Sequence, residues 1–396
     1  MRDWLDVEHA GADLSVSITR AEFFVLRAPC ETPVRTSFGT MLDRPAVYVR
    51  LEASDGATGL GEVWCNFPSC GAEHRGRLLE SAVFPALLER DFVSPAECFA
   101  ALTTRFERLA IQAGEEGPIA QCLAGIDGAL WDMVAKRAGA PLYRMLGGND
   151  PIIGVYASGI NPTGAVETVA RCRARGYTAF KLKIGFGDEI DLANLAGIAD
   201  GLSDGDQMMT DVNQGWTVEK SLAMLPKLAG FPLRWLEEPL LATSPPTQWQ
   251  ELARASPIPL AAGENIMGQE TFERAAKGGA FGVLQPDLCK WGGISGTFPV
   301  ARGILDAGLR YCPHFLGGGI GLAASAHLLA AVGGDGILEI DSNANPLRED
   351  LFSPDISAGR IDIGRADGIG ISDAEFRDVL RSQPKGTLAA QAQATR

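Results

Sequence analysis

Seven ionisable residues recur through the second half of the chain at nearly equal intervals of 28, 26, 27, 23, 27 and 25 residues. Nearly every one closes a short apolar run. In chain order they are Lys183, Asp211, Glu237, Glu264, Asp287, His314 and Glu339. About 25 residues make one strand and one returning helix, and reactive side chains at the C-terminal ends of parallel strands are typical of a (β/α)8 barrel. The spacing therefore predicts an α/β fold, a modified TIM-type barrel, with an active site at the strand ends.

The composition narrows the classes of partner. The chain of 396 residues is 46% hydrophobic, enough for a large core, and carries a net charge of −14. This acidity disfavours nucleic acid and anionic membranes as partners, although a bound cation can still attract an anionic small molecule. None of the eight cysteines forms a C-x-x-C pair, and we interpret them as reduced thiols of a cytoplasmic protein. Neither a signal-peptide pattern nor an apolar stretch of about 20 residues is present, so we expect no membrane span.

The pattern of predicted strands and helices changes near residue 148. Before it, strands joined at the tight-turn dipeptide Asp55-Gly56 combine with a helical pattern over 119–134, where apolar residues recur every three or four positions. After it, strands and helices alternate, and seven to eight strands are visible. We predict five segments, namely a polar extension (1–16), an α+β domain (17–147), a barrel (148–345), a segment that returns to the first domain (346–380) and a disordered tail (381–396).

Three of the seven residues are carboxylates that end consecutive strands: Asp211, Glu237 and Glu264. In a parallel barrel such side chains meet over one opening, where they repel one another unless a cation lies between them. Oxygen ligands alone suit a hard divalent ion, which favours Mg2+ over zinc. Helix caps or surface ion pairs explain each acid singly, but not three in this register. Glu238 adjoins Glu237, and because strand side chains alternate between faces, only one of the two can point at the metal.

Candidate bases lie on either side of these carboxylates in the sequence. Lys181 and Lys183 share one strand face, and a nearby second cation lowers the pKa of a lysine so that it can act as a base near neutral pH. Asp287 and His314 end later strands, close enough for the carboxylate to hold the imidazole and raise its basicity. His327 instead lies in an apolar helix, where we expect a packed or capped histidine.

Together these residues and their neighbours resemble the enolase superfamily, mandelate racemase subgroup, over nearly the whole chain. The matching motifs are K-x-K at 181–183, DVNQ at 211–214, WLEEP at 235–239, GEN at 263–265, PD-x-x-K-x-G-G at 286–293, PH at 313–314 and LEID at 338–341. The resemblance implies a capping role for the α+β domain and a homo-oligomeric assembly. The implied side-chain roles are Mg2+ ligand for Asp211, Glu237 and Glu264, catalytic group for Lys183, Lys181, Asp287 and His314, and substrate contact for Asn213 and Glu339.

The chemistry that the resemblance implies is removal of the proton next to a carboxylate. This step produces an ene-diolate, whose charge Mg2+, Lys181 and a protonated Glu339 are expected to stabilise. Lys183 and His314 on opposite faces of the α-carbon permit two outcomes. Loss of a β-hydroxyl, the dehydration of an acid sugar to a 2-keto acid, is our first hypothesis because it is the commoner activity among such relatives. Return of the proton to the other face, as in a racemase of 2-hydroxy acids, is the alternative.

Two loops, 34–41 and 63–75, are expected to cover the opening and select the substrate, a small carboxylate. Phe38 and Asn66 are their candidate substrate contacts. The glycine run at 317–321 leaves a rival hypothesis open, because glycines after a late barrel strand can hold a phosphate at a helix N-terminus. A phosphosugar isomerase, or a Schiff-base aldolase using Lys183, would follow, but the three acids would then be unexplained. A barrel kept only for binding, without catalysis, is a third hypothesis.

Overall fold

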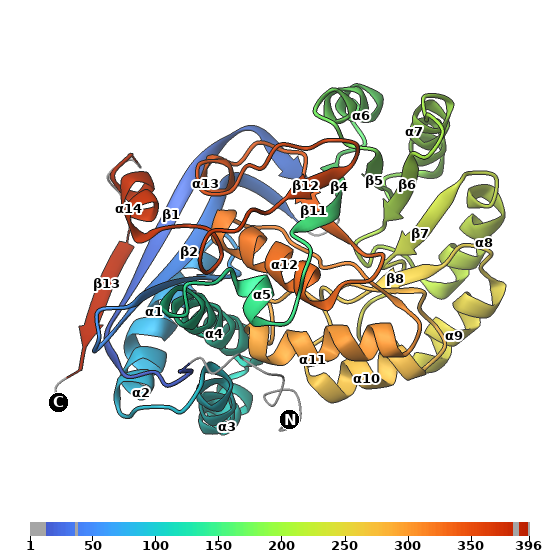
Figure 1. Cartoon of the computed structure of the whole chain (residues 1–396). Helices are drawn as coiled ribbons and strands as arrows, with labels where there is room; N and C mark the ends of the chain where they lie inside the picture. Colours follow the sequence, from blue (N-terminus) through green and yellow to red (C-terminus); the bar gives the residue numbers. More distant parts are fainter. Residues whose placement is uncertain (1–12, 36–38, 383–387, 395–396) are drawn as a thin grey trace.

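The computed structural model describes residues 13–35, 39–382 and 388–394, which form two packed parts (Figure 1). One is a four-stranded antiparallel sheet with helices, and the other is a nearly closed barrel of eight parallel strands. The predicted modified TIM-type barrel with an N-terminal α+β domain is therefore confirmed. Within the described ranges, no helix combines the length and apolarity needed to cross a bilayer.

The N-terminal domain is built on a sheet with the strand order β13-β1-β2-β3. Its own elements are β1 (Ile18–Arg35), β2 (Thr40–Ala53), β3 (Thr58–Val63), α1 (Gly71–Leu78), the π-helical turn η1 (Leu79–Val83), α2 (Phe84–Leu88), α3 (Pro95–Ala113), α4 (Glu116–Arg137) and α5 (Leu142–Met145). β2 and β3 form the hairpin expected at Asp55-Gly56. Residues 1–12 of the predicted polar extension lie outside the described residues, whereas Val16 is buried and pairs with Phe92, so the folded domain begins before residue 17.

Helix α4 lies in contact with β3 on one side and with a barrel helix on another, and it is buried on nearly all sides. Its close approach to β3 depends on glycine. A Cβ on Gly59 or Gly61 would lie 2.0 Å from a backbone carbonyl oxygen of α4, and a Cβ on Gly125 would lie 2.5 Å from Cγ2 of Val63. The helix therefore packs backbone against backbone, which fixes the N-terminal domain against the barrel.

Two glycines of α4 should respond oppositely to alanine. Gly125→Ala overpacks the contact with Val63 and should lower the free energy of unfolding by about 1–3 kcal/mol. Gly128 has open space where its Cβ would be, so Gly128→Ala should raise that free energy by roughly 0.5–1 kcal/mol through helix propensity. Urea unfolding of both variants measures the difference, and equal effects would contradict the close packing.

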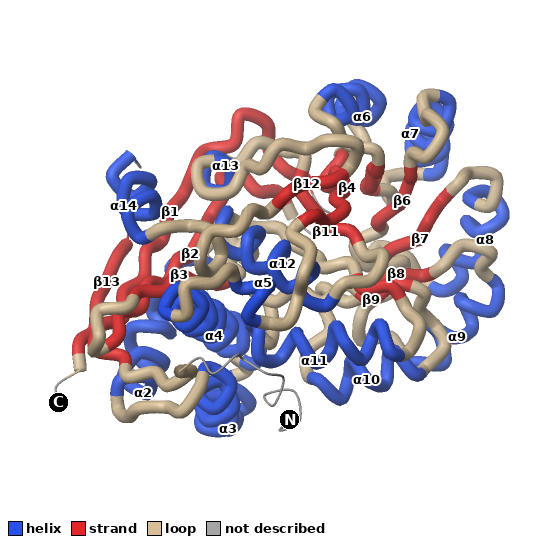
Figure 2. The backbone as a smooth tube through the Cα atoms, viewed as in Figure 1, coloured by secondary structure: helices blue, strands red, loops and turns tan. Residues whose placement is uncertain are grey.

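The barrel strands follow one another around the barrel in chain order (Figure 2). They are β4 (Ile152–Ile160), β5 (Ala179–Lys183), β6 (Gln207–Asp211), β7 (Leu233–Glu237), β8 (Leu260–Ala262), β9 (Val283–Leu284), β10 (Arg310–Tyr311) and β11 (Ile337–Asp341). The outer helices between them are α6 (Ala165–Ala174), α7 (Asp188–Asp200), α8 (Val218–Leu228), α9 (Pro246–Ala255), α10 (Gln269–Lys277), α11 (Gly293–Asp306) and α12 (Gly319–Val332). β11 pairs with β4. Between β10 and β11, the barrel is joined by a 3.4 Å hydrogen bond from the Glu339 N–H to the carbonyl of Pro313, which follows β10.

One residue from each strand, or from the position just after β10, fills the centre of the barrel. These buried residues are Tyr156, Ala179, Met209, Trp235, Ala261, Val283, Cys312 and Ile337. Tyr156 and Trp235 meet edge to face, with ring centroids 5.5 Å apart. Large rings on two strands thus face small side chains on others, and the layer forms a solid floor beneath the strand C-terminal ends.

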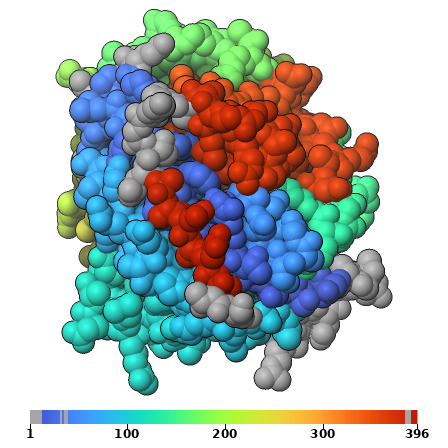
Figure 3. All heavy atoms as spheres, turned by 90° about the vertical axis from the view of Figure 1, so that its left-hand side faces the viewer, coloured from blue at the N-terminus to red at the C-terminus, as the bar shows by residue number. Residues whose placement is uncertain are grey.

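The C-terminal segment contacts both parts. After α13 (Pro346–Glu349), β12 (Arg360–Asp362) pairs antiparallel with β4, and α14 (Asp373–Ser382) places Phe376 against Phe24 and Tyr48 of the N-terminal sheet. The prediction of a disordered tail is wrong for β13 (Leu388–Gln393), which pairs with β1 as the edge strand of the N-terminal sheet and lies at the surface in Figure 3. Ala390 and Ala392 of β13 pack on the core. Because the edge of β1 would otherwise be unpaired, β13 is ordered by pairing with it although its sequence is rich in glutamine and alanine.

Candidate active site

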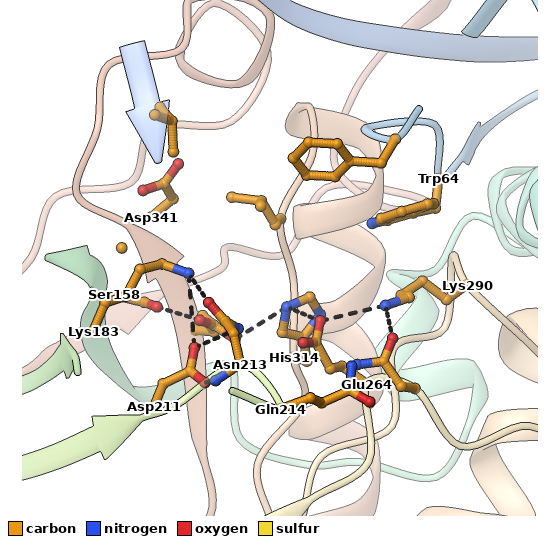
Figure 4. Close-up of a pocket in the computed structure, with 16 residues that line it drawn as sticks. Trp64, Ser158, Lys183, Asp211, Asn213, Gln214, Glu264, Lys290, His314 and Asp341 are labelled. Atoms are coloured by element: carbon orange, nitrogen blue, oxygen red, sulfur yellow. Dashed lines mark hydrogen bonds and ion pairs between the residues drawn. The ribbon is translucent and has the colours of Figure 1, made fainter. Parts of the chain in front are cut away.

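A cavity of about 250 Å³ opens at the C-terminal ends of the barrel strands. Strand ends and the loops after them form its walls, and Val34, Trp64 and Phe67 of the N-terminal domain contribute its cover. Five of the seven periodic residues line it, namely Lys183, Asp211, Glu264, His314 and Glu339. Figure 4 shows Lys183 and Asp211 on one side and Trp64 and Lys290 on the other, with His314 between them.

Four of the periodic residues, Asp211, Glu237, His314 and Glu339, belong to one layer directly above the barrel floor. Side chains of a strand alternate between faces, so a residue two positions beyond a floor residue points the same way. Ser158, Lys181, Asp211, Glu237, Gln285, His314 and Glu339 each lie two positions beyond a member of the floor. Lys183, Asp211 and Glu237 are also direct register partners on β5, β6 and β7.

The three predicted metal ligands each have a cationic partner in this structure. Asp211 lies 3.8 Å from the Lys183 ammonium, Glu237 is paired with Lys181, and Glu264 Oε2 lies 2.9 Å from His314 Nε2. Among the described residues, no three His, Cys, Asp or Glu side chains are gathered closely enough to hold a metal ion. The donors themselves fit Mg2+, because all three are carboxylates on neighbouring strand ends and their contacts are with exchangeable side-chain cations.

Lys181 and Glu237 lie beneath the cavity rather than on its wall. Lys181 is 2% exposed and also forms a 2.9 Å ion pair with Glu339. Burial favours a low pKa for Lys181, but Glu237 and Glu339 raise its pKa well above the usual range. Glu237 also accepts hydrogen bonds from Trp235 Nε1 at 2.9 Å and Gln285 Nε2 at 2.6 Å. Burial raises its pKa to about 7 despite Lys181.

His314 and Asp287 lie together, as the spacing predicted. Nδ1 of His314 is 2.7 Å from Asp287 Oδ2, and its Nε2 faces Glu264 inside the cavity. Burial favours a low pKa for His314, but Glu264, Glu339 and Asp287 raise its pKa well above the usual range. Nε2, the ring nitrogen that Asp287 does not hold, is therefore the one that faces the cavity.

Glu339 differs from the sequence-based expectation of a protonated acid. Burial favours a raised pKa for Glu339, but Lys181, His314 and a hydrogen bond from Ser158 lower its pKa below the usual value. The Phe315 N–H, 3.4 Å away, also points at Glu339 Oε2. Glu339 Oε2 also lies 3.9 Å from His314 Nε2, a neighbour that favours the ionised carboxylate over the protonated acid.

Strained backbone surrounds the strand ends. Asn213, Gln214 and Glu238 have φ angles of 47°, 63° and 38°, values that are rare outside glycine and concentrate at functional sites. Asn213 places its Oδ1 2.5 Å from Lys183 Nζ, while its Nδ2 donates to Asp211 at 2.9 Å. The turn at Glu238 also removes it from the strand, so the face-alternation argument does not apply to it. Its buried carboxylate accepts two bonds from Asn265, and burial followed by Glu264 raises its pKa well above the usual range.

One of the two predicted loop contacts, Asn66, does not line the cavity, and the other cannot be placed. Phe38 lies outside the described residues. Asn66 is 6% exposed, and its Nδ2 donates to the Leu316 carbonyl at 2.6 Å, so the structure gives it a role in holding a loop. Conversely, sequence reasoning missed Lys290, although it lies in the PD-x-x-K motif. Its Nζ is 2.8 Å from Asn265 Oδ1 and 4.8 Å from the Trp64 ring centroid.

The glycine run at 317–321 holds an internal carboxylate. Glu62 of β3 accepts hydrogen bonds from the Gly318 and Gly321 N–H groups at the start of α12. Burial raises the pKa of Glu62 to about 7, while these two N–H groups favour its ionised form. A phosphate at this helix N-terminus would have to displace Glu62, which removes the basis for the phosphate hypothesis.

Comparison with known proteins gives consistent matches across the chain. A family model described as mandelate racemase / muconate lactonizing enzyme, N-terminal domain, matches residues 20–147, and one described as enolase C-terminal domain-like matches residues 164–375. A D-galactarolactone cycloisomerase of Agrobacterium fabrum is 31% identical over 92% of this chain and 98% of its own length. An L-talarate/galactarate dehydratase of Salmonella typhimurium is 32% identical over 66% of this chain and 65% of its own length.

Solved structures extend the similarity to three dimensions. A mandelate racemase/muconate lactonizing enzyme from Bordetella bronchiseptica RB50 is 50% identical, with a TM-score of 0.87 over 92% of this chain and 99% of the other. A racemase from Streptomyces coelicolor A3(2) with bound magnesium is 26% identical, with a TM-score of 0.82 over 93% of this chain and 100% of the other.

Proposed function

The chain belongs to the mandelate racemase/muconate lactonizing enzyme family of the enolase superfamily, and from this premise we propose that it dehydrates an acid sugar to a 2-keto acid. The reaction removes the proton next to the carboxylate and then expels the β-hydroxyl as water. The observation that carries the proposal is that Lys183 and His314, two groups able to transfer protons, line the same cavity with carboxylates between them. Relatives named as acid-sugar dehydratases and cycloisomerases support the same class of reaction.

In the proposed site, Asp211, Glu237 and Glu264 hold Mg2+, an ion also present in the similar racemase structure. When bound, Mg2+ neutralises the charge that develops on the substrate carboxylate as the α-proton leaves. Lys181, buried beneath the cavity, adds a positive charge that acts in the same direction. Asn213 Oδ1, 2.5 Å from Lys183 Nζ, orients Lys183 toward the cavity, where Lys183 in its neutral amine form accepts the α-proton.

The second half of the reaction needs an acid. Asp287 accepts the Nδ1 hydrogen of His314, which directs the Nε2 proton to the cavity. As the β-hydroxyl leaves, His314 donates this proton to it, and water is released. Racemisation remains the alternative, because His314 could instead return a proton to the face of the α-carbon opposite Lys183.

Turnover should depend on a divalent ion. Protein treated with EDTA should lose at least about 100-fold in kcat, because the negative charge of the ene-diolate is then not neutralised and the energy of the transition state rises. Addition of Mg2+ should restore kcat. Mg2+ should also raise the melting temperature, a readout that needs no substrate. Full turnover after EDTA, with no rebinding of a divalent ion, would exclude the three carboxylates as its site.

A screen of mono- and diacid sugars in D2O separates the candidate reactions. Dehydration yields a 2-keto acid, whereas racemisation yields no keto product but places deuterium on the α-carbon and changes optical rotation. Absence of α-deuterium and of keto product for every acid tested would overturn the proposed proton abstraction. Borohydride trapping of a substrate on Lys183 would instead support the aldolase hypothesis.

A further inference from the structure

A buried carboxylate of the N-terminal domain reaches into the barrel next to the acid/base machinery. Glu62 is 5% exposed and lies at the end of β3. Its Oε2 accepts the Gly321 N–H at 2.7 Å, and its Oε1 accepts the Gly318 N–H. The proposed reaction gives this residue no part, and a carboxylate that loses hydration on burial needs these bonds in return.

The segment that Glu62 holds is shaped to receive it. A Cβ on Gly318 would lie 2.2 Å from the Tyr48 hydroxyl and 3.0 Å from Glu62 Oε1, and a Cβ on Gly317 would lie 2.7 Å from the same oxygen. Neither glycine has a positive φ, so their small size rather than their backbone freedom is what the site uses. The glycine run is thus the surface on which β2 and β3 of the N-terminal domain sit.

This segment is also part of the cavity. The glycine run directly follows residues 314–316, of which His314 and Leu316 line the cavity. The Leu316 carbonyl accepts a hydrogen bond from Asn66. Two positions beyond Glu62, Trp64 forms part of the cavity cover, and its backbone N–H points at the Cys289 carbonyl, 3.4 Å away. Glu62 therefore ties the strand that presents the cover to the loop that presents the histidine.

We propose that Glu62 is a positioning residue that fixes the loop 315–321, and with it His314 and Leu316, relative to the cover residue Trp64. It touches neither substrate nor metal in this assignment and acts only through the backbone N–H groups of Gly318 and Gly321. The effect on turnover rests on the proposed function, whereas the effect on the loop does not.

Hydrogen exchange tests the loop without any substrate. Glu62→Gln keeps the size but offers a single acceptor oxygen, so a peptide covering 315–322 should exchange its amide hydrogens about tenfold faster or more. The matched control is Asp132→Asn. Asp132 is another buried carboxylate that accepts two backbone N–H groups, from Leu60 and Ile369, and it lies off the cavity wall, where it also pairs with Lys136 at 2.6 Å. Exchange over 315–322 should be unchanged in the control, and unchanged exchange in Glu62→Gln would overturn the proposal.

Steady-state kinetics tests the catalytic consequence. Glu62→Gln should lower kcat by about 10- to 100-fold with KM changed less than about threefold, because misplacement of the acid affects the reacting geometry more than binding. Asp132→Asn should keep kcat within about threefold. Gly318→Ala displaces the same loop while leaving Glu62 intact, and it should reproduce the kcat loss if Glu62→Gln fails to fold. Faster exchange with unchanged kcat in both variants would refute positioning, and a wild type inactive on every acid would refute the proposed function alone.

Discussion

Replacing His314 with asparagine should lower kcat by a factor of about 10²–10⁴ while leaving the protein folded. The imidazole lines the cavity and is held from behind by a buried carboxylate, through the 2.7 Å contact with Asp287. Asparagine can still donate to Asp287 but has no proton to give to a leaving hydroxyl. Loss of the acid therefore stops the second half of the proposed reaction without removing a buried partner from Asp287.

The first half should survive in this variant. Because Lys183 remains, the substrate α-proton should still exchange with D2O, observable by NMR as deuterium at the α-carbon without keto product. His74→Asn is the matched control, since His74 pairs with Glu115 on the N-terminal domain and lies off the cavity wall. It should keep kcat within about twofold of wild type. If His314→Asn loses exchange and product together, His314 rather than Lys183 removes the proton.

The fold and the layer of site residues can be predicted from the sequence because both depend on one repeat length along the chain. A strand and a helix take about 25 residues, so residues on that period fall at equivalent heights of the barrel. The same rule would have found Ser158 and Gln285, which occupy the layer on β4 and after β9. They were missed because a search for ionisable residues passes over neutral ones.

What the sequence could not supply are the contacts that cross between the two domains. Asn66 holds the Leu316 carbonyl and Glu62 holds the start of α12, each from about 250 residues away. The local sequence does not predict such contacts, because the spacing of side chains along one strand or helix does not indicate which other element packs against it. The lowered pKa of Glu339 could not be predicted for a related reason. Its pKa is set by Lys181 and His314 together, and their distances are properties of the folded barrel.

Lys181 offers the sharpest test of the charge balance beneath the cavity. Lys181→Met should lower the free energy of unfolding by about 3–5 kcal/mol, because Glu237 and Glu339 would remain buried without their common cation. Urea unfolding in the presence of EDTA measures this loss. Lys220→Met is the matched control. Lys220 pairs with Asp188 at the surface, where a salt bridge contributes only about 0–1 kcal/mol.

Two further measurements separate lost charge from lost packing. In Lys181→Met with Glu339→Gln, one of the two uncompensated carboxylates is neutral, so the double variant should recover part of the stability that the single variant loses. Mg2+ should raise the unfolding midpoint of Lys181→Met by more than that of wild type, because Glu237 then lacks a protein cation that competes with the metal. Should Mg2+ stabilise both proteins equally, Glu237 would not be a ligand, and the metal would have to be held by Asp211 and Glu264 without it.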